Sequence, residues 1–471
     1  MSSTNLVWLR NDLRVSDNPA LSAAIKHGDK TVALYVHERT DGVRPPGAAG
    51  RWWLHQSLVS LGRDLAGIGI ALIVRSGESQ AVVRDAAAEF AVDCVYWNRR
   101  YAPGEVAVDA AIKAALRAQG VTVASFGANV LIEPWDISTG QGRPYSVFTP
   151  FWRSIKARDI DRPLPRPPAG EPIESSDLDS GYVEPEWAGK LAQHWQIGEA
   201  AAQAKLGDFL DERLEIYPAG RDFPAKSVTS MLSPHLRFGE ISPRQIWHSA
   251  LAALHAEPER QAATDKFLSE LAWRDFSYHQ LFHRADIATE PMQPKYSRMH
   301  WRESRADLVA WQRGQTGLPI IDAGMRELWE TGYMQNRVRM LVASVLAKNM
   351  LIDWREGERW FWDCLVDGDV ASNPASWQWV AGSGLDAAPY FRIFNPVTQG
   401  EKFDTEGDYV RRWVPELARL PDKWIHRPAE APDAVLEAAN VSIGRNYPRP
   451  IVDLQSSRVR ALEASAELKE E

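Results

Sequence analysis

The sequence predicts an α/β N-terminal doubly wound parallel sheet followed by a large all-α C-terminal domain. Strand-like and helix-like segments alternate over residues 1–129, a segment rich in proline and acid follows, and helical periodicity with frequent tryptophan begins near residue 191. Alternation of this kind is typical of parallel sheets. We therefore expect an α/β domain at 1–129, an interdomain linker at 130–190 and a helical domain at 191–471.

Short apolar runs rich in β-branched residues predict five strands in the first domain. The runs are NLVWLR (5–10), TVALYVH (31–37), IALIVR (70–75), CVYWN (94–98) and VTVASF (121–126), with helical patterns near 19–27, 51–67, 79–91 and 105–119. Asn18 before Pro19 predicts an N-cap followed by proline in the first helical position. Gly67-Ile68-Gly69 precedes a strand and lacks a third glycine, so we expect no dinucleotide fingerprint on this sheet.

Linker composition and helix-start signals predict how the rest of the chain is divided into elements. Residues 162–187 have the composition of a semi-extended linker. Ser233-Pro234 and Ser242-Pro243 predict helices that begin with proline in the first position. The final ALEASAELKEE predicts a short charged helix or a frayed tail.

The composition is that of an ordinary globular protein, with 45% apolar and 25% charged residues among 471. Because the net charge is −8, any contact with nucleic acid requires a local basic face. Cys94 and Cys364 are too few for a disulfide framework, a zinc finger or a four-cysteine cluster. No signal peptide or bilayer-length apolar run is present, so we expect a cytoplasmic protein without a membrane segment.

The turn TSMLS is a candidate phosphate site. It comprises Thr229, Ser230, Met231, Leu232 and Ser233. Hydroxyl groups and backbone N–H groups before a helix suit a phosphate or pyrophosphate, and Tyr217 and Arg221 lie just upstream. An ordinary capping turn is the alternative.

The segment SELAWRDFSYH places four polar or aromatic residues at helical offsets 0, 3, 4 and 7, namely Glu270, Trp273, Arg274 and Ser277. An acid, an indole and a guanidinium on one face predict a pocket wall with a stacking surface and a hydrogen-bond acceptor. A solvated helix edge with an i,i+4 Glu–Arg pair is the alternative.

The segment TGYMQNRVRMLVASVLAK predicts a second pocket helix. Asn336 and Met340 are four residues apart, so they share a face and offer an amide and a soft thioether. Arg337 is placed to reach a phosphodiester, and Arg339 to pair with an internal acid. An amphipathic helix without further function is the alternative.

The segment DGDVASNPASWQW, residues 367–379, begins with two acids one glycine apart. Asp367 and Asp369 suit either a hard metal ion or hydrogen bonds from sugar hydroxyls and ring N–H groups, with an arginine such as Arg339 keeping one acid ionised. Because no acid or histidine cluster lies nearby in the sequence, we favour the second interpretation and expect no metal.

The same segment ends with two indoles, Trp377 and Trp379. In a helix, residues two apart point about 200° apart. We therefore expect one indole to point inward and the other toward a cleft.

Ordered blocks of the chain resemble the DNA photolyase/cryptochrome family. They are LVWLRNDLRVSDNPAL, TSMLSPHLRFGEIS, ELAWRDF, TGLPIIDAGMREL, TGYMQNRVRM, IDWREGERWF, DGDVASNPASWQWVAGSG and DAAPYFRIFNPVTQGEKFD. Together they extend over nearly the whole chain. The resemblance implies an α/β domain, a long linker and a helical FAD-binding domain. The chain is most similar to a cyclobutane pyrimidine dimer photolyase of the subgroup close to plant cryptochromes.

The resemblance implies FAD as the cofactor. The implied contacts are Tyr217, Thr229, Ser230, Met231, Leu232, Ser233, Glu270, Trp273, Arg339, Asp367, Asp369 and Asn373. The TSMLS turn would hold the phosphates and ribityl chain, and Asn373 would lie beside flavin N5. Some plant-type sensors carry aspartate at that place, so the asparagine favours repair.

The resemblance also implies contacts with UV-damaged DNA. Glu270, Trp273, Asn336, Met340 and Trp379 would line a pocket for a flipped-out dimer, and Glu270 would stabilise the substrate radical anion. The implied contacts to the DNA strand are Arg221, Arg274, Arg337 and Arg392. We expect a monomer.

Three tryptophans match the family's electron relay: Trp377, Trp354 and Trp301. Each could equally be an ordinary core residue. Trp360 and Trp362 are candidates for a second branch.

The activity implied is that of a deoxyribodipyrimidine photo-lyase, a carbon–carbon lyase in which excited reduced FAD donates an electron, the cyclobutane ring splits and the electron returns. Relatives that repair (6-4) photoproducts carry histidines in the region where this chain has Asn336 and Met340, and no histidine occurs between His300 and His426. The main alternative is a cryptochrome-type blue-light photoreceptor without repair activity.

A second, light-harvesting chromophore is implied in the α/β domain, with methenyltetrahydrofolate favoured. Glu105 stands near where some relatives bind a folate, and Glu133 matches the place used by a plant-cryptochrome-like subgroup. We favour Glu133; a plain loop acid before Pro134 is the alternative.

Overall fold

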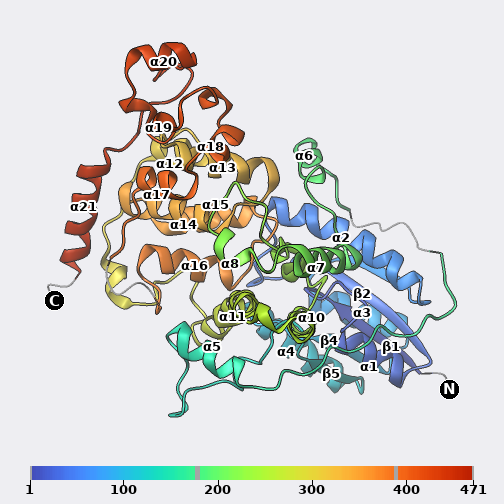
Figure 1. The fold of residues 1–471 in the computed structure, drawn as a ribbon. Coiled ribbons are helices and arrows are strands. Elements are labelled where there is room, and N and C mark those ends of the chain that lie inside the picture. Colours follow the sequence, from blue (N-terminus) through green and yellow to red (C-terminus); the bar gives the residue numbers. More distant parts are fainter. Residues whose placement is uncertain (1–2, 175–180, 387–390, 469–471) are drawn as a thin grey trace. The chain divides into compact units, whose positions relative to one another are not determined.

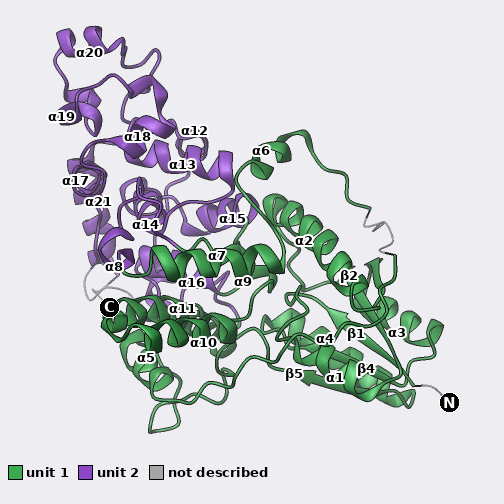
Figure 2. Cartoon of the chain, turned by 45° about the vertical axis from the view of Figure 1, so that its right-hand side comes forward, with its two compact units in different colours: residues 1–215, 230–285, 366–371 green, residues 216–229, 286–365, 372–471 purple. Residues whose placement is uncertain are grey.

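A computed structural model describes residues 3–174, 181–386 and 391–468. The chain forms two compact units, which are drawn along the sequence in Figure 1 and coloured separately in Figure 2. Unit 1 contains Met1–Glu215, Ser230–Ala285 and Val366–Ala371, and unit 2 contains Ile216–Thr229, Asp286–Leu365 and Ser372–Glu471. Each unit is described by itself. The predicted domain boundaries near residues 129 and 191 stay predictions.

Unit 1 combines a parallel sheet with helices. Its strands are β1 (Thr4–Leu9), β2 (Lys30–Glu38), β3 (Leu72–Gly77), β4 (Cys94–Asn98) and β5 (Thr122–Phe126). Its helices are α1 (Pro19–His27), α2 (Ala48–Ala66), α3 (Ser79–Glu89), α4 (Pro103–Ala118), α5 (Phe148–Lys156), η1 (Glu186–Ala188), α6 (Gly189–Ala192), α7 (Glu199–Glu212), α9 (Ser233–Phe238), α10 (Pro243–Ala256), η2 (Pro258–Arg260) and α11 (Gln261–His283).

The sheet has the order β3-β2-β1-β4-β5, and every pairing is parallel. Leu6 of β1 is in register with Val32 of β2 and Val95 of β4. Because the strand order reverses direction after β3, right-handed connections place α1 and α2 on one face and α3 and α4 on the other. The predicted doubly wound parallel sheet is therefore confirmed.

One predicted strand is displaced. The run at 70–75 was expected to form a strand, but β3 begins at Leu72. The preceding residues close the turn after α2: Gly69 has a φ of 78°, and the Ile70 amide donates to the Leu65 carbonyl at 2.9 Å. That backbone geometry delays the extended conformation.

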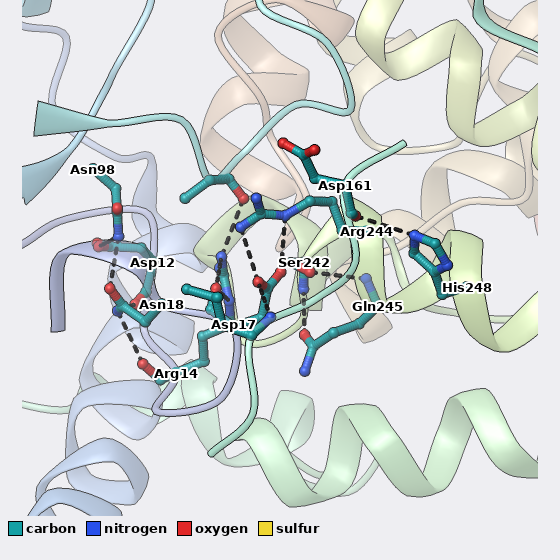
Figure 3. Close-up of polar contacts among 12 residues, drawn as sticks. Asp12, Arg14, Asp17, Asn18, Asn98, Asp161, Ser242, Arg244, Gln245 and His248 are labelled. Atoms are coloured by element: carbon teal, nitrogen blue, oxygen red, sulfur yellow. Dashed lines mark hydrogen bonds and ion pairs between the residues drawn. The ribbon is translucent and has the colours of Figure 1, made fainter. Parts of the chain in front are cut away.

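A buried polar network fixes the loop after β1 (Figure 3). The Asn98 amide at the end of β4 donates to Asp12 Oδ2 at 2.6 Å and to Asn18 Oδ1 at 2.8 Å. Asn18 Oδ1 also accepts from the Leu21 amide, so the predicted cap of α1 is confirmed. Arg244 of α10 pairs with Asp17 at 2.8 Å, which ties this loop to the helical part of unit 1.

Buried ion pairs occupy the end of the sheet where β1 and β4 diverge. Arg10 pairs with Asp109 at 3.2 Å, and Arg100 pairs with the same carboxylate at 2.7 Å and with Glu38. In open α/β sheets, ligands usually bind at this switch point. Here the chain's own side chains lie there, which agrees with the absence of a dinucleotide fingerprint.

The two predicted helix starts differ in detail. Ser242 caps α10 in a reciprocal capping box with Gln245, with distances of 2.9 Å and 2.8 Å, as its sequence predicts. Ser233 was expected to precede its helix, but α9 begins at Ser233 itself and is preceded by Leu232 without a side-chain cap. The Ser233 hydroxyl donates to Asp367 Oδ2 at 2.6 Å, so it serves a long-range contact instead of a cap.

The segment predicted as a linker contains regular structure at both ends. Helix α5 packs on α11, where the Phe148 ring stacks on Trp273 with a centroid distance of 3.7 Å. Residues 159–174 and 181–185 are without helix or strand, as the proline-rich composition predicts. Residues 175–180 lie outside the described part of the chain.

Unit 2 is helical. Its elements are α8 (Tyr217–Gly220), η3 (Pro294–Arg298), α12 (Arg305–Gln312), α13 (Pro319–Thr331), α14 (Asn336–Ser344), a π-helical turn η4 (Val345–Asn349), α15 (Trp354–Cys364), α16 (Ser372–Ala381), α17 (Pro396–Phe403), α18 (Asp408–Trp413), η5 (Pro415–Leu417), α19 (Asp422–Ile425), η6 (Pro428–Glu430), α20 (Asp433–Ala439) and α21 (Leu454–Glu467). None of the described helices is long and apolar enough to cross a membrane.

One large apolar core holds unit 2 together. Trp311, Trp354 and Trp377 are buried in it, as expected of aromatic filling in a helical domain. At its edge the buried Asp322 carboxylate accepts from the Tyr447 hydroxyl at 2.8 Å and from the Thr316 amide at 2.6 Å. These bonds satisfy an acid that would otherwise be costly to bury.

Candidate functional site

The two acids of DGDVASNPASWQW are buried side chains of unit 1. Asp367 Oδ2 accepts from the Ser233 hydroxyl at 2.6 Å, and Asp369 Oδ2 accepts from the Tyr278 hydroxyl at 2.7 Å. Asp369 Oδ1 also accepts from the Ala371 amide at 3.0 Å. Gly368 between them contributes its carbonyl to Arg237 Nε at 2.6 Å. Both acids are therefore anchored to the helices of unit 1.

Tyr278 and Arg274, both on α11, form the electrostatic surroundings of Asp369. Burial, and then the Asp369 carboxylate, raise the pKa of Tyr278 well above its ordinary value, so the phenol stays protonated and donates. The Arg274 guanidinium lies 4.8 Å from the Tyr278 ring centroid and donates to the Asn129 carbonyl. The acids are thus held as hydrogen-bond acceptors in a buried, partly cationic environment.

The described residues contain no group of three or more His, Cys, Asp or Glu side chains that could hold a metal ion. Asp367 and Asp369 instead meet hydroxyl, amide and phenol donors. Carboxylate oxygens held in this way are acceptors, which suit ligands that present N–H and O–H groups.

The TSMLS turn contains a strained residue. Met231 has a φ of 54°, in the left-handed region that side chains larger than glycine seldom adopt. The turn changes unit between Thr229 and Ser230, so only Ser230 to Ser233 belong with Asp367 and Asp369. Strain of this size persists where surrounding structure over-determines the backbone, which is common at ligand sites.

The predicted pocket face on α11 is half-buried. Glu270 pairs with Lys266 one turn earlier at 2.6 Å. One face of the Trp273 indole is covered by Phe148, and the indole also meets Phe276 edge-on at 5.8 Å. Helix α11 therefore presents an acid and an aromatic edge that are both braced by local contacts.

Asn336 and Met340 meet on α14 of unit 2 as their spacing predicts. The Asn336 amide lies 3.8 Å from Met340 Sδ. Arg337 pairs with Asp222 at 2.7 Å and lies over the Phe403 ring at 4.5 Å, so any contact with DNA would require it to leave or share this partner.

Arg339 points to a different environment from Arg337. Its Nε donates to the Met334 carbonyl at 2.6 Å, and its guanidinium lies 5.0 Å from the Tyr333 ring centroid. Burial raises the pKa of Glu327 to about 7, and the nearby Arg339 charge opposes that shift. The pairing of Arg339 with an internal acid such as Asp367 or Asp369 stays a prediction; within unit 2, Glu327 is an acid whose pKa the Arg339 charge influences.

Upstream, Tyr217 and Arg221 lie in one turn at α8. The Arg221 amide donates to the Tyr217 carbonyl at 2.9 Å, and its guanidinium lies 5.4 Å from the Tyr217 ring centroid. Gln335 donates to the Arg221 carbonyl, which joins this turn to the start of α14.

Asn373 is a buried side chain of α16 with a fixed orientation. Its Nδ2 donates to the Glu358 carbonyl at 3.0 Å and to Glu358 Oε1 at 2.8 Å. Because both amide protons are engaged by Glu358, the Asn373 side-chain oxygen is oriented away from that residue. Glu358 of α15 is thus the residue that positions Asn373.

The two indoles of α16 have different environments, as the helical spacing predicts. Trp377 is 2% exposed and packs among Trp311, at 6.2 Å, and Phe361, at 5.0 Å. Trp379 is half-exposed and only packs against the edge of the same core. The inward indole is confirmed; the orientation of Trp379 toward a cleft stays a prediction.

Trp377 and Trp354 are connected through Gly357. A Cβ atom at Gly357 would lie 2.0 Å from Trp377 Cη2, so α15 approaches this indole with its backbone. Trp354 lies three residues before Gly357 on the same face of α15. Trp354 and Trp377 are both buried in the same apolar core.

Trp301, the third relay candidate, lies at the edge of that core. It is half-buried and packs both on the main cluster and on a small cluster of Met299, Leu351 and Leu468. Its neighbour Arg302 is bonded to the Leu351 carbonyl at 2.6 Å, just before α15 begins. Two of the three indoles are therefore buried in the core of unit 2, and Trp301 is partly buried against it; a relay through them stays a prediction.

The second-branch candidates differ from each other. Trp360 stacks on Trp329 with a centroid distance of 6.0 Å and an interplanar angle of 5°, and Trp329 is 56% exposed. Trp362 is buried. A route through Trp360 would therefore end on an exposed indole.

Glu133 lies in an aromatic corner of unit 1. It pairs with Arg99 at 2.9 Å and accepts from the Tyr101 hydroxyl at 2.9 Å. A Cβ at Gly127 would lie 2.3 Å from Glu133 Oε1, so the carboxylate packs directly on this glycine. Trp135 beside it is 47% exposed and meets Tyr101 at 6.3 Å. An acid, a phenol and an open indole together suit a flat aromatic ligand.

Glu105 takes part in structural contacts at the start of helix α4. It accepts from the Ala102 amide at 3.2 Å at the start of α4 and lies 3.9 Å from Arg100. Burial raises the pKa of Glu105. These contacts make Glu105 a helix-capping residue within the buried ion pairs of the sheet.

Several residues at the site escaped the sequence argument. Tyr278 holds Asp369, Glu358 positions Asn373, and Asp222 holds Arg337. Ser233 was predicted as a cofactor contact, but its hydrogen bond to Asp367 was not predicted. Only Tyr278 had a usable signal, since it lies four residues after Arg274 on α11. The other pairs are separated by 15 or more residues, so spacing could not reveal them.

Comparison with known protein families defines the class of protein. The "FAD binding domain of DNA photolyase" matches residues 267–467, and "DNA photolyase" matches residues 5–169. The chain belongs to the DNA photolyase/cryptochrome family.

Individual relatives are similar over nearly the whole of this chain. A deoxyribodipyrimidine photo-lyase of Agrobacterium fabrum is 48% identical, with 98% of each chain covered. Cryptochrome-1 of Arabidopsis thaliana is 36% identical over 98% of this chain and 70% of its own. The crystal structure of a bacterial class III photolyase from Agrobacterium tumefaciens has a TM-score of 0.94 at 46% identity, covering 100% of this chain and 98% of that one.

Proposed function

We propose that the protein is a deoxyribodipyrimidine photo-lyase, which uses light to split cyclobutane pyrimidine dimers in UV-damaged DNA. Whole-length similarity to a photo-lyase, at 48% identity, is the observation that carries this proposal. Similarity to cryptochrome-1 is lower and leaves 30% of that protein unmatched, since 70% of it is covered. A cryptochrome-type photoreceptor is therefore the second candidate.

The donor and acceptor set of the buried acids fits FAD. Asp367 and Asp369 each have one oxygen bound to a hydroxyl of the protein, and carboxylate oxygens can accept further bonds from ribose hydroxyls and ring N–H groups. When bound, reduced FAD supplies the electron that light makes available. Ser233 and Tyr278 keep the acids in place, and Asn373, fixed by Glu358, would present its oxygen near flavin N5.

We propose that residues of the predicted pocket faces contact the damaged bases. Trp379 and Trp273 offer aromatic surfaces for an extruded dimer, because base–aromatic stacking tolerates either pyrimidine. Glu270 would accept or share a proton in a hydrogen bond to the base edge and so stabilise the negative charge that develops on the dimer. Asn336 and Met340, 3.8 Å apart on α14, would offer an amide and a thioether to the base.

The relay would serve to reduce the cofactor and not to repair DNA. Trp377 and Trp354 are buried in the core of unit 2, and Trp301 is partly buried against it. Indoles at short spacing can pass an electron in successive steps, so an external reductant could act at the outer end.

We also propose a second chromophore at Glu133, with methenyltetrahydrofolate as the favoured occupant. Glu133 would accept a ring N–H, and the exposed Trp135 would provide a stacking face. Glu105 is less suited because α4 and Arg100 already engage it. We also propose a reducing, cytoplasmic environment, which the presence of only two cysteines in the sequence supports.

The first prediction concerns the activity itself. Purified protein with chemically reduced FAD should convert a cyclobutane-dimer oligonucleotide to monomeric thymines under near-ultraviolet or blue light, and not in the dark. Chromatography of the oligonucleotide measures the product. If the flavin absorbs light but the amount of dimer does not fall, the photoreceptor function would be favoured instead.

The second prediction concerns the relay. Trp377→Phe should abolish photoreduction of oxidised flavin, because phenylalanine is far harder to oxidise, while chemically reduced protein still repairs dimers. Absorbance near 450 nm follows the flavin. Trp247→Phe, a buried indole of unit 1, is the matched control. Photoreduction at the wild-type rate in Trp377→Phe would refute the role and direct attention to Trp360 and Trp329.

The third prediction concerns the second chromophore. Protein reconstituted with methenyltetrahydrofolate should show a near-ultraviolet absorber distinct from FAD, and Glu133→Ala should lose it. Glu89→Ala breaks another Glu–Arg pair of unit 1, of 2.7 Å, and should retain it. Identical spectra for wild type and Glu133→Ala would exclude this site.

A further inference from the structure

Unit 2 contains a groove with one wall that carries Arg392, a DNA contact implied by the family resemblance, and a second wall, on helix α21, that has no role so far. It has a volume of about 400 Å³ and lies between helix α21 and the segment 391–393. Helix α21 is the last helix in Figure 1. The groove is lined by Phe391, Arg392, Ile393, Arg458, Leu462, Ser465 and Ala466.

Two arginines of this lining, Arg392 and Arg458, are exposed and lack acidic partners. Within the described part of the chain, neither guanidinium has a hydrogen bond or an ion pair. Other arginines of unit 2 do: Arg326, for example, pairs with Glu416 at 2.8 Å. The acidic residues near the end of α21 are not part of the lining. Two like charges facing one groove repel each other until an anion neutralises them.

The wall that carries Arg392 is held from beneath by Lys348 of η4. Lys348 is buried, its Nζ donates to the Arg392 carbonyl at 2.5 Å, and it lies 4.3 Å from the Phe391 ring centroid. Burial, and then the Arg392 charge, lower the pKa of Lys348 to about 7. Below that pH a third positive charge therefore lies under the groove.

The opposite wall is fixed by the same π-helical turn. Arg460 of α21 donates to the Asn349 carbonyl at 2.7 Å, and the Asn349 amide donates to Ser457 Oγ at 3.0 Å. Both walls thus rest on η4, and π-helical turns are frequent at functional sites. The groove is pre-organised and need not form on binding.

We propose that this groove binds a phosphodiester group of a DNA strand, with the adjoining nucleoside against the apolar wall. The guanidinium forks of Arg392 and Arg458 match a phosphate oxygen pair, and Phe391, Ile393 and Leu462 cover an apolar surface that a free inorganic anion would leave unused. The inference rests on the proposed function only for the identity of the polyanion. It adds α21 to the residues expected to contact DNA.

Substitution of the helix arginine tests the charge. Arg458→Gln should weaken dark binding of a duplex oligonucleotide and reduce the magnitude of the slope of log K against log salt by about 0.9, the value for one lost phosphate contact. Arg445→Gln removes an exposed arginine of unit 2 outside the groove and should leave the slope unchanged. Fluorescence anisotropy measures both constants, and equal slopes for the two variants would overturn the proposal.

A second pair of variants tests the location on α21. Leu462→Glu places a carboxylate in the groove, whereas Val459→Glu adds the same charge at an exposed position of the same helix outside the lining. Only Leu462→Glu should weaken DNA binding more than tenfold; equal affinities would refute the site.

Binding in the dark separates this inference from the lyase activity. If light-driven repair fails but Arg458→Gln still changes the slope, the groove stands as a DNA site and the lyase proposal falls. If repair succeeds and neither variant pair differs, the groove proposal alone is rejected.

Discussion

The burial of two carboxylates one glycine apart is the constraint on which the candidate site depends. Asp367 and Asp369 lie inside unit 1, where an ionised acid is stable only if donors surround it. Ser233 and Tyr278 provide these donors at 2.6 Å and 2.7 Å, from α9 and α11. Residues 366–371 therefore belong to unit 1, although the chain on either side of them belongs to unit 2.

The residues of the segment DGDVASNPASWQW are anchored in different units. Its acids are anchored to the helices of unit 1, while Asn373 is anchored to Glu358 in unit 2 and the two indoles follow on α16. Helical spacing separates the indoles: Trp377 enters the aromatic core, and Trp379 stays at its edge. In the proposed function, the buried Trp377 would pass electrons toward the cofactor, and the partly buried Trp379 would stack on a base.

Local sequence patterns were sufficient to predict those features that depend on interactions between residues close together in the sequence. The five strands, the Asn18 cap and the helix start at Ser242-Pro243 all follow from signals within a few residues, and each is confirmed, although the third strand begins two residues later than predicted. The opposite environments of Trp377 and Trp379 follow from helix geometry alone. The family resemblance implied that FAD is the cofactor and that the reaction is driven by light. Residue spacing alone could not indicate either.

Long-range partners set the limit of that approach. Ser233 appeared to be a cap because it precedes proline, but its hydroxyl bonds Asp367, 134 residues away. Asn373 and Arg337 likewise depend on Glu358 and Asp222, whose identities give no local signal. Such contacts arise only when the fold is complete, so a single sequence cannot reveal them.

The central claim is that the acid pair, held by Tyr278, is the cradle of the flavin, and FAD affinity tests it most directly. Asp369→Asn should raise the dissociation constant for FAD about tenfold or more, since a hydrogen bond to a charged group contributes about 1.5–3 kcal/mol. Tyr278→Phe should weaken binding as well, whereas Tyr145→Phe, also in unit 1, should not. Flavin fluorescence during titration of apoprotein gives the constants. Wild-type affinity in both Asp369→Asn and Tyr278→Phe would contradict the account.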